Sequence, residues 1–339
     1  MEISVIIPVF NAEKYVAKAV ASALQFPEVK EVLLIEDGSP DNAIQVCRNL
    51  AADHDRVKFL QHPDKGNHGA GASRNLGLQN TSYPFIAFLD ADDFFLPNRF
   101  EADKKVFTEI PNADGVYNAI GVHYYDPEAQ ERFCHVFPNQ LTTVLTVVQP
   151  EILFPSFIHL SKGVGYFSLD GLTIKKDILK KIDYCFNDGL RLHQDTEFRI
   201  RLAYYARLFP GEISYPAAMR GVHSENRIAR NYFDKKNRNI NQEKLWISLY
   251  EWAKKDKIPD KYLKQIGRIK VVTSILAHSY FVSWFIFIKS VLKDRNILIK
   301  PVFYNQIHDH LFGRNQLSRL LLKIKNKIQR ILHIGNNLL

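Results

Sequence analysis

Residues 85–93 read Phe85-Ile86-Ala87-Phe88-Leu89-Asp90-Ala91-Asp92-Asp93, an apolar run that ends in three carboxylates. Similar short apolar runs recur along the first hundred residues, and helical patterns separate them. The runs cover 3–9, 32–36, 57–60 and 85–89, and the helical patterns cover 12–25, 42–53 and 69–79. Nearly all-apolar strands that alternate with helices are typical of a parallel sheet with helices on both faces. We therefore predict a Rossmann-like α/β fold.

In such sheets, ligands bind at the carboxyl ends of the strands. Asp90 and Asp92 follow a strand directly, and their i, i+2 spacing on extended backbone places both side chains on one side. Carboxylates this close repel each other unless a cation or a donor lies between them. A divalent ion such as Mg²⁺ or Mn²⁺ fits. The alternative is a solvated acidic turn.

Two further segments carry candidate ligands. Asp37 follows the strand at 32–36, where it could accept from a ribose hydroxyl or a base N–H, or cap the next helix. The small residues of 68–77 open a helix, so that backbone N–H groups could approach a phosphate. Tight helix packing with Arg74 at the surface is the alternative. The glycine pattern follows the third strand, not the first, and this position argues against a dinucleotide-binding dehydrogenase. No Walker A sequence is present either.

Together these residues resemble the family 2 glycosyltransferases, which have the GT-A fold. Four motifs carry the resemblance in the expected order: Ser4–Asn11, Glu36–Ser39, Gly71–Asn75 and Phe88–Asp93. A match in one motif would be weak, whereas four in register are specific. The resemblance covers roughly the first 100 residues and resumes near residue 165.

The resemblance implies a nucleotide-diphospho-sugar donor, most readily a UDP-sugar, with Mn²⁺ or Mg²⁺ as the cofactor and transfer with inversion. Asp37 would contact the nucleobase, Asp92 would hold the metal, and Asp90 would contact the ribose or the sugar. The implied nucleotide-sugar-binding residues are Pro8, Val9, Asn11, Asp37, Arg74, Asp90, Ala91 and Asp92.

A second block, 171–176 and 190–202, looks like the family segment that carries Glu-Asp before a helix, in which the Asp is the catalytic base. Here the pair is Gln194-Asp195, so the base is kept and the supporting acid is missing. Inverting transfer needs a carboxylate that takes the proton of the acceptor hydroxyl opposite the leaving group. The alternative for Asp195 is an N-cap for a helix predicted over 196–208.

The segment 220–227 resembles a His-containing turn that closes the family's active site. His223 or Arg220 could reach the metal or the diphosphate from there. A surface loop is the alternative, since a single His is as common at the surface as at a metal.

The positive charge is concentrated in the last third of the chain. The net charge is +9, but residues 230–339 carry 22 basic and 7 acidic side chains, whereas residues 1–229 carry 23 and 29. We therefore divide the chain into a catalytic domain, 1–229, and a helical basic region, 230–339. No nucleic-acid-binding motif accompanies the charge, so we expect no nucleic-acid partner.

An amphipathic helix is predicted near 314–334. Its apolar positions share one face: Leu317, Leu320, Leu321, Ile324, Ile328 and Ile331. Residues 313–339 hold six Lys/Arg and no acid, so this helix could lie on an anionic membrane surface or pack on the catalytic domain. The uncharged stretch 271–288 is shorter than the about 20 residues of a spanning helix, and we expect a buried or interfacial helix there.

Three cysteines, without metal-ligand spacing, favour a reduced compartment. The N-terminus lacks the basic and long apolar stretches of a secretory signal. We therefore expect a cytoplasmic enzyme, peripheral on the inner face of the plasma membrane.

The function expected is an inverting, metal-dependent hexosyltransferase in cell-surface polysaccharide synthesis, acting on a glycan or lipid-linked acceptor. A sugar-phosphate nucleotidyltransferase shares the architecture, but needs a Gly-rich phosphate loop after the first strand, where this chain has Pro8-Val9-Phe10-Asn11. A non-catalytic nucleotide-sugar binder is the other alternative, which Asp90, Asp92 and Asp195 disfavour.

Overall fold

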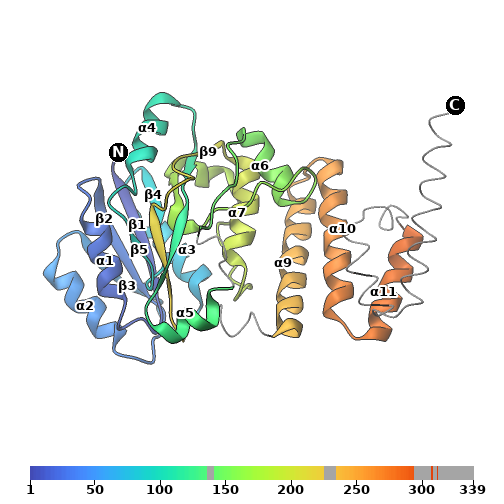
Figure 1. The fold of residues 1–339 in the computed structure, drawn as a ribbon, viewed down its shortest axis with the longest axis horizontal. Helices are drawn as coiled ribbons and strands as arrows, with labels where there is room; N and C mark the ends of the chain where they lie inside the picture. The colour runs from blue at the N-terminus through green and yellow to red at the C-terminus, as the bar shows by residue number, and fades with distance from the viewer. Residues whose placement is uncertain (136–140, 225–233, 294–306, 308–310, 312–339) are drawn as a thin grey trace. The chain divides into compact units, whose positions relative to one another are not determined.

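The computed structural model describes residues 1–135, 141–224, 234–293, 307 and 311. The chain divides into two compact units, Met1–Phe233 and Asp234–Leu339. The first unit holds both β-sheets, and the described part of the second unit is helical (Figure 1).

The main sheet of the first unit has seven strands in the order β3-β2-β1-β4-β8-β6-β9. The first four are mutually parallel, β8 runs antiparallel to both of its neighbours, and β9 is parallel to β6. The bounds are β1 Ile3–Val9, β2 Val29–Glu36, β3 Val57–Gln61, β4 Phe85–Phe88, β6 Gly115–Tyr117, β8 Leu172–Lys175 and β9 Leu208–Pro210.

The first unit also contains a smaller sheet of three strands. Its order is β5 (Phe94–Phe95), β10 (Ala218–Val222), β7 (Ile120–Tyr124), with β10 antiparallel to β5 and parallel to β7. Because β5 follows Asp93 immediately, this sheet fixes the position of the acidic turn.

Helices cover the main sheet on both faces. Successive side chains of β1 point alternately to one face and to the other. Val5 and Ile7 belong to the core under α1 (Val16–Leu24) and α2 (Ala43–Asp53). Ile6 faces α3 (Ala70–Asn80), where a Cβ at Gly77 would lie 2.5 Å from the Ile6 side chain. The remaining helices of this unit are α4 Glu101–Glu109, α5 Pro127–Phe133, α6 Pro150–Phe157, α7 Gln194–Tyr205 and the 3₁₀ turns η1 Leu169–Gly171 and η2 Lys176–Lys181.

The second unit contains three described helices, α9 (Lys235–Lys255), α10 (Asp260–Ala277) and α11 (Tyr280–Lys293), with α10 packed against both of the others. Among the residues that the structure describes, none of the helices has the length and apolar character needed to cross a membrane. The amphipathic helix predicted near 314–334 lies outside the described residues.

The mostly parallel α/β fold is confirmed, and the predicted strands and helices of the first hundred residues are all present with small shifts at their ends. Two predictions are wrong. The helix expected over 196–208 ends at Tyr205, and Leu208 begins β9 instead. The stretch 271–288 is two helices, because the chain turns at His278 and Ser279 between α10 and α11.

Candidate active site

The carboxyl ends of β1, β2 and β4 open onto one edge of the main sheet. Because β8 runs antiparallel to β4, its beginning lies at the same edge. Residues that precede β8 therefore meet residues that follow β4. The backbone N–H of Asp90 donates to Oδ1 of Asp170 over 2.9 Å, which joins the two segments.

Arg74 connects α3 to the acidic strand end. Its Nη2 donates to Oδ1 of Asp90, and the guanidinium lies 5.5 Å from the centre of the Phe186 ring. The side chain is buried, so the alternative of Arg74 at the surface is wrong. Its Nε and Nη1 make no hydrogen bond to any residue that the structure describes. Since unpaired buried donors cost free energy, these two groups favour an added acceptor.

Asp93 and Asp170 are buried carboxylates next to Asp90. One ligand oxygen from each of the three lies within 4.8 Å of the others. Oδ1 of Asp93 accepts from the backbone N–H of Gly221, and Oδ2 of Asp170 accepts from the Ser168 hydroxyl, both over 2.8 Å. Burial, reinforced by the neighbouring carboxylates, raises the pKa of Asp93 well above its usual range.

The pKa of Asp90 is also raised, mainly by burial. The carboxylates of Asp170 and Asp195 add to this effect, and the guanidinium of Arg74 opposes it. Asp195, in α7, is thus near enough to Asp90, which follows β4, to contribute to this raised pKa. Arg74 is the cation common to both.

Asp92 lies on the open side of this cluster, with 30% of its side chain exposed. Its Oδ2 is 3.4 Å from Nε2 of His223, which directly follows β10. His223 stacks on Tyr15 with ring centres 4.6 Å apart, and the Tyr125 hydroxyl donates to the Asp92 backbone carbonyl over 3.1 Å. The structure thus brings Asp92 and His223 together. Surface exposure of His223 is excluded, because the residue is buried.

Two neighbours of His223 in the chain have other partners. Nη1 of Arg220 donates to Oγ1 of Thr142 over 3.2 Å. Gly221 allows β10 to approach the acidic turn, since a Cβ there would lie 2.0 Å from the carbonyl oxygen of Asp92. His223 is thus beside Asp92, and the guanidinium of Arg220 is near enough to Asp93 to oppose the rise in its pKa.

The donor set at this edge fits a divalent cation. Carboxylate oxygens are the ligands that Mg²⁺ and Mn²⁺ prefer, and imidazole is a common metal ligand. Asp92, on the open side, provides a carboxylate oxygen, and the buried His223 beside it provides an imidazole nitrogen. Asp93 and Asp170 offer further oxygens but are buried and already accept backbone or hydroxyl hydrogen bonds. Asp92 and His223 are thus the side chains best placed to hold an ion that also contacts a ligand.

Asp195 lies in the first turn of α7. The helix begins at Gln194, and its N-cap is His193 with a left-handed φ of 63°. Asp195 is therefore inside the helix, and the alternative of an N-cap role is wrong. Its side chain is 42% exposed, and Oδ2 lies 3.4 Å from Nη2 of Arg199.

The charge state of Asp195 follows from its neighbours. Partial desolvation by the surrounding protein acts to raise the pKa of Asp195. Arg199, then Arg74, then the backbone N–H of Thr196, and then His193 act against it, and together they lower that pKa. Asp195 is thus an ionised carboxylate at neutral pH with an open face. This combination is what a proton acceptor needs.

Glu197, the other acid in this turn, is fully buried. Nε and Nη2 of Arg201 donate to its two oxygens over 2.9 and 2.7 Å, and the Tyr184 hydroxyl donates over 2.7 Å. A carboxylate held this way cannot meet a ligand, which leaves Asp195 as the accessible acid of α7.

Asp37 is buried and organises the loop before α3. Its carboxylate accepts from the backbone N–H groups of His68 and Gly69, each over 2.8 Å, and from Nδ2 of Asn67 over 3.1 Å. The N–H groups of His68 and Gly69, at the start of the segment 68–77, thus bind Asp37. The N-cap of α2 is Asn42, so the capping alternative for Asp37 is wrong.

The site residues predicted at the end of β1 differ in their exposure. Pro8 and Val9 are buried in the strand, and the Val9 carbonyl accepts from the Asp37 N–H over 2.9 Å. Asn11 is exposed, has a left-handed φ of 53°, and its N–H donates to Oγ of Ser39 over 3.1 Å. Ala91 is likewise buried. At Pro8, Val9 and Ala91, contact with a ligand would therefore come from the backbone.

The segment before α7 packs on the same loop. Nη1 of Arg191 donates to Oδ1 of Asn67 over 2.9 Å, and the Gln194 side chain lies so close to Gly71 that a Cβ there would be 3.1 Å from its Cγ. Gln194, which replaces the usual acid, thus packs against the start of α3.

Sequence reasoning missed Asp170 and Arg199. The strand-end rule for a parallel sheet points only to residues that follow strands. Asp170 precedes a strand, and it reaches this edge because β8 is antiparallel. For Arg199 a signal was present, since residues four apart on a helix are neighbours.

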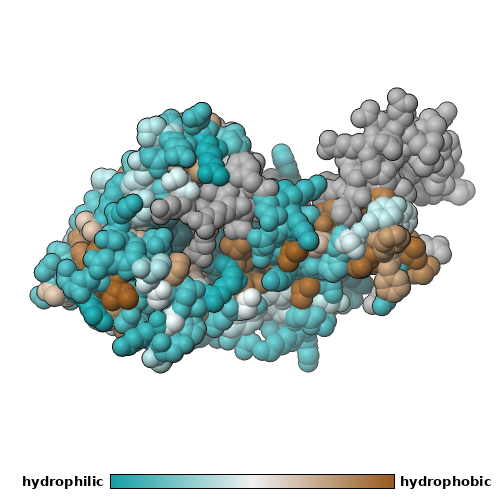
Figure 2. All heavy atoms as spheres, turned by 90° about the horizontal axis from the view of Figure 1, so that it is seen from below, coloured by the Kyte–Doolittle hydropathy of each residue, from teal (hydrophilic) through white to brown (hydrophobic). Residues whose placement is uncertain are grey.

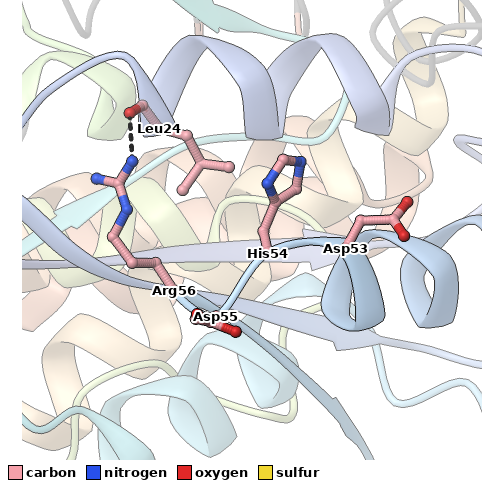
Figure 3. A pocket seen from close by; sticks show the side chains of 5 residues that line it. All are labelled: Leu24, Asp53, His54, Asp55 and Arg56. Atoms are coloured by element: carbon pink, nitrogen blue, oxygen red, sulfur yellow. Dashed lines mark hydrogen bonds between the residues drawn. The ribbon is translucent and has the colours of Figure 1, made fainter.

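A separate cavity of about 350 Å³ lies far from these residues in the fold, near the beginning of β3 (Figure 3). It is lined by Leu24, Asp53, His54, Asp55 and Arg56. The guanidinium of Arg56 donates there to the backbone carbonyls of Leu24, Phe26 and Val29. We assign this cavity no role.

The chain is similar in sequence to known proteins. Residues 4–151 match the sequence profile of the family described as Glycosyl transferase family 2. The Bacillus subtilis Minor teichoic acid biosynthesis protein GgaA is 34% identical over 249 residues, which are 69% of this chain and 50% of GgaA. Glycosyltransferase GlyG of Streptococcus pneumoniae is 30% identical over 198 residues, which are 57% of this chain and 64% of GlyG. The chain thus spans between half and two thirds of these relatives.

Among solved structures, the crystal structure of S. aureus TarS 1-349 in complex with UDP-GlcNAc matches with a TM-score of 0.57. The match covers 92% of this chain and 80% of that chain, at 17% sequence identity. At this identity the likeness concerns the fold alone, and it confirms the fold class expected from the sequence.

Proposed function

Because the chain belongs to glycosyl transferase family 2, we propose that it transfers a sugar from a nucleotide-diphospho-sugar to a hydroxyl acceptor, with inversion at the anomeric carbon. One observation carries the proposal. Two side chains of types that bind metals, Asp92 and His223, and an ionised, open carboxylate, Asp195, lie at the same sheet edge around Arg74 and Asp90.

The donor would bind along the ends of β1, β2 and β4. Arg74 supports this role, because its unpaired Nε and Nη1 would find acceptors in the donor's oxygens. Asp90 would contact the ribose or the sugar, and the backbone around Pro8, Val9 and Ala91, with the side chain of Asn11, would line the nucleoside pocket. Asp37 would shape this pocket mainly by holding the loop at 67–69, since that loop uses both of its oxygens.

Asp92 and His223 would hold Mn²⁺ or Mg²⁺ on the diphosphate. When bound, the ion neutralises the charge that develops on the departing diphosphate. The contribution of the protein is to fix the two ligands. Tyr15 stacks on the His223 ring, and Tyr125 binds the Asp92 backbone.

Asp195 would act as the base. A single displacement inverts the anomeric carbon, and it requires a carboxylate that accepts the proton of the acceptor hydroxyl as the new bond forms. The lowered pKa of Asp195 keeps it ionised for this step. Arg199 would hold the carboxylate in place, because it anchors it from the next turn of the same helix.

The acceptor is proposed to be a glycan or a lipid-linked sugar of a cell-surface polymer, since GgaA is named for teichoic acid biosynthesis. A UDP-sugar is the first donor to test, because TarS was solved with UDP-GlcNAc. We further propose a cytoplasmic enzyme that the basic residues of 230–339 draw to an anionic membrane surface.

Two alternatives are weaker. A sugar-phosphate nucleotidyltransferase would need free backbone donors after β1, whereas the N–H of Asn11 is already bound to Ser39. A non-catalytic binder would have no need of the ionised, open carboxylate of Asp195.

The proposal is tested by a screen of nucleotide-sugars for turnover with and without Mn²⁺ or Mg²⁺. We expect at least one donor to be hydrolysed slowly in a metal-dependent manner, and Asp92→Asn to abolish this turnover. Asp177→Asn is the matched control, because Asp177 is exposed and paired only locally with Lys180. Metal-independent turnover that survives in Asp92→Asn would contradict the proposed metal role.

A further inference from the structure

Helix α11 carries an apolar stripe on its exposed side. The stripe consists of Phe281, Phe285, Ile288 and Leu292, which are 84%, 68%, 53% and 82% exposed. Their spacing of four, three and four residues places them on one face, within about 60° of one another at 100° per residue. Figure 2 shows hydrophobic side chains gathered over the part of the molecule that α11 occupies.

The opposite face of α11 is fixed against α10. Ser283 is fully buried, and its hydroxyl donates to the backbone carbonyls of Ile275 and His278 over 2.7 and 3.2 Å. Because Ser283 lies about half a turn away from the stripe, the stripe faces away from α10. Its exposure is therefore a property of how the two helices pack.

Charge and composition indicate what such a face contacts. The sequence of α11, YFVSWFIFIKSVLK, contains five aromatic residues and no acid, and the exposed Lys289 flanks the stripe. The surrounding region, 230–339, has 22 basic and 7 acidic side chains. A protein partner would need an apolar face with acidic surroundings, whereas an anionic bilayer offers both over an unlimited area.

The length of α11 defines the mode of contact. Its 14 residues extend about 21 Å, which is shorter than the about 30 Å hydrocarbon core of a bilayer. A short amphipathic helix with aromatic residues and lysines lies in the interface plane.

We infer that α11 is the surface by which this protein binds anionic membranes, with the stripe at the boundary of the acyl chains and Lys289 at the lipid phosphates. This inference names the residues that would make the membrane contact proposed above. It does not depend on the transfer chemistry.

The test is sedimentation of the full chain with vesicles of phosphatidylcholine alone or mixed equally with phosphatidylglycerol. We expect the wild type to bind the anionic vesicles, and Phe281→Ser/Phe285→Ser to bind them about tenfold or more weakly. Leu145→Ser/Val147→Ser is the matched control, since these apolar residues of the first unit are 67% and 71% exposed. Lys289→Glu should weaken binding to anionic vesicles and leave the neutral ones unaffected.

Three outcomes would overturn the inference: equal binding by the stripe variant and the wild type, no vesicle binding by the wild type, or a wild-type dimer in solution that the stripe variant dissociates. The last would show that a second copy covers the stripe. Donor turnover measured without vesicles should be the same in wild type and stripe variant. A failure of the wild type to turn over any donor would count against the proposed reaction and leave the membrane result unaffected.

Discussion

Asp93 and Asp195 are carboxyl groups at the same sheet edge, and their pKa values are shifted in opposite directions. Asp93 is enclosed among other carboxylates, so burial and repulsion raise its pKa. Asp195 is also affected by burial, but the guanidinium groups of Arg199 and Arg74, together with the Thr196 N–H and His193, outweigh it. The two arginines near Asp195 therefore help to keep it ionised, and able to accept a proton, at neutral pH.

This difference predicts a pH dependence. Arg199 lowers the pKa of Asp195, so Arg199→Met should raise it, and the acidic limb of kcat/KM should move to higher pH. Arg199→Lys keeps the charge and is the control, with a limb close to that of the wild type. Because the position of the limb does not depend on the amount of active enzyme, partial unfolding would not imitate the shift. If the acidic limb is unchanged in Arg199→Met, Asp195 is not the group whose ionisation that limb reports.

His223 supports a second prediction at this scale. If it shares an ion with Asp92, His223→Ala should raise the metal concentration needed for half-maximal activity by at least about tenfold. His54→Ala, at the distant cavity, is the control. If both variants need the same metal concentration for half-maximal activity, His223 is not a ligand of the metal.

At the scale of elements, the close approach of β10 to the acidic turn fixes the geometry of the site. Gly221 is the point of contact, since a Cβ there would lie 2.0 Å from the Asp92 carbonyl oxygen, which is backbone and cannot rotate away. The adjacent hydrogen bond from the Gly221 N–H to Asp93 holds the same pair of segments together.

Gly221→Ala should therefore displace the turn at Asp92 and Asp93. We expect a loss of about 1–3 kcal/mol in the free energy of unfolding, measured by urea denaturation, together with weaker metal activation. Gly163→Ala is the matched control, because a Cβ at Gly163 meets nothing within 4 Å. If both variants are as stable as the wild type, the close approach does not constrain the site.

The elements also explain what could be predicted from the sequence. The parallel strands and the helices between them follow from local patterns, and so do the residues at the strand ends, such as Asp90 and Asp92. Asp170 could not be placed, because the antiparallel direction of β8 results from long-range pairing with β4 and β6. The hydrogen bonds from the N–H groups of His68 and Gly69 to Asp37 could not be predicted for a similar reason, since Asp37 reaches them across the fold.

At the scale of the whole molecule, the net charge of +9 is the sum of two opposed regions. Residues 1–229 carry more acids than bases, and residues 230–339 carry most of the excess positive charge. The carboxylates of the site and the apolar stripe of α11 belong to different compact units, so catalysis and membrane binding should be separable.

A chain that ends at Phe233 tests this separation. Because the first unit has its own sheets and core, we expect it to unfold cooperatively and to retain metal-dependent donor turnover. It should lose binding to anionic vesicles, measured by sedimentation. Vesicle binding that equals that of the full chain would place the membrane surface in the first unit.

The assignment of Asp195 as the base is the central claim, and Asp195→Asn tests it most directly. The substitution removes the proton acceptor but keeps the size of the side chain. Asp177→Asn is the control, because Asp177 is exposed and pairs with Lys180. Donor affinity and the rate of transfer to acceptor are measured on the same preparation. We predict unchanged donor affinity and a transfer rate about 10²–10⁴-fold lower than that of the wild type. Transfer by Asp195→Asn at the wild-type rate would contradict the account.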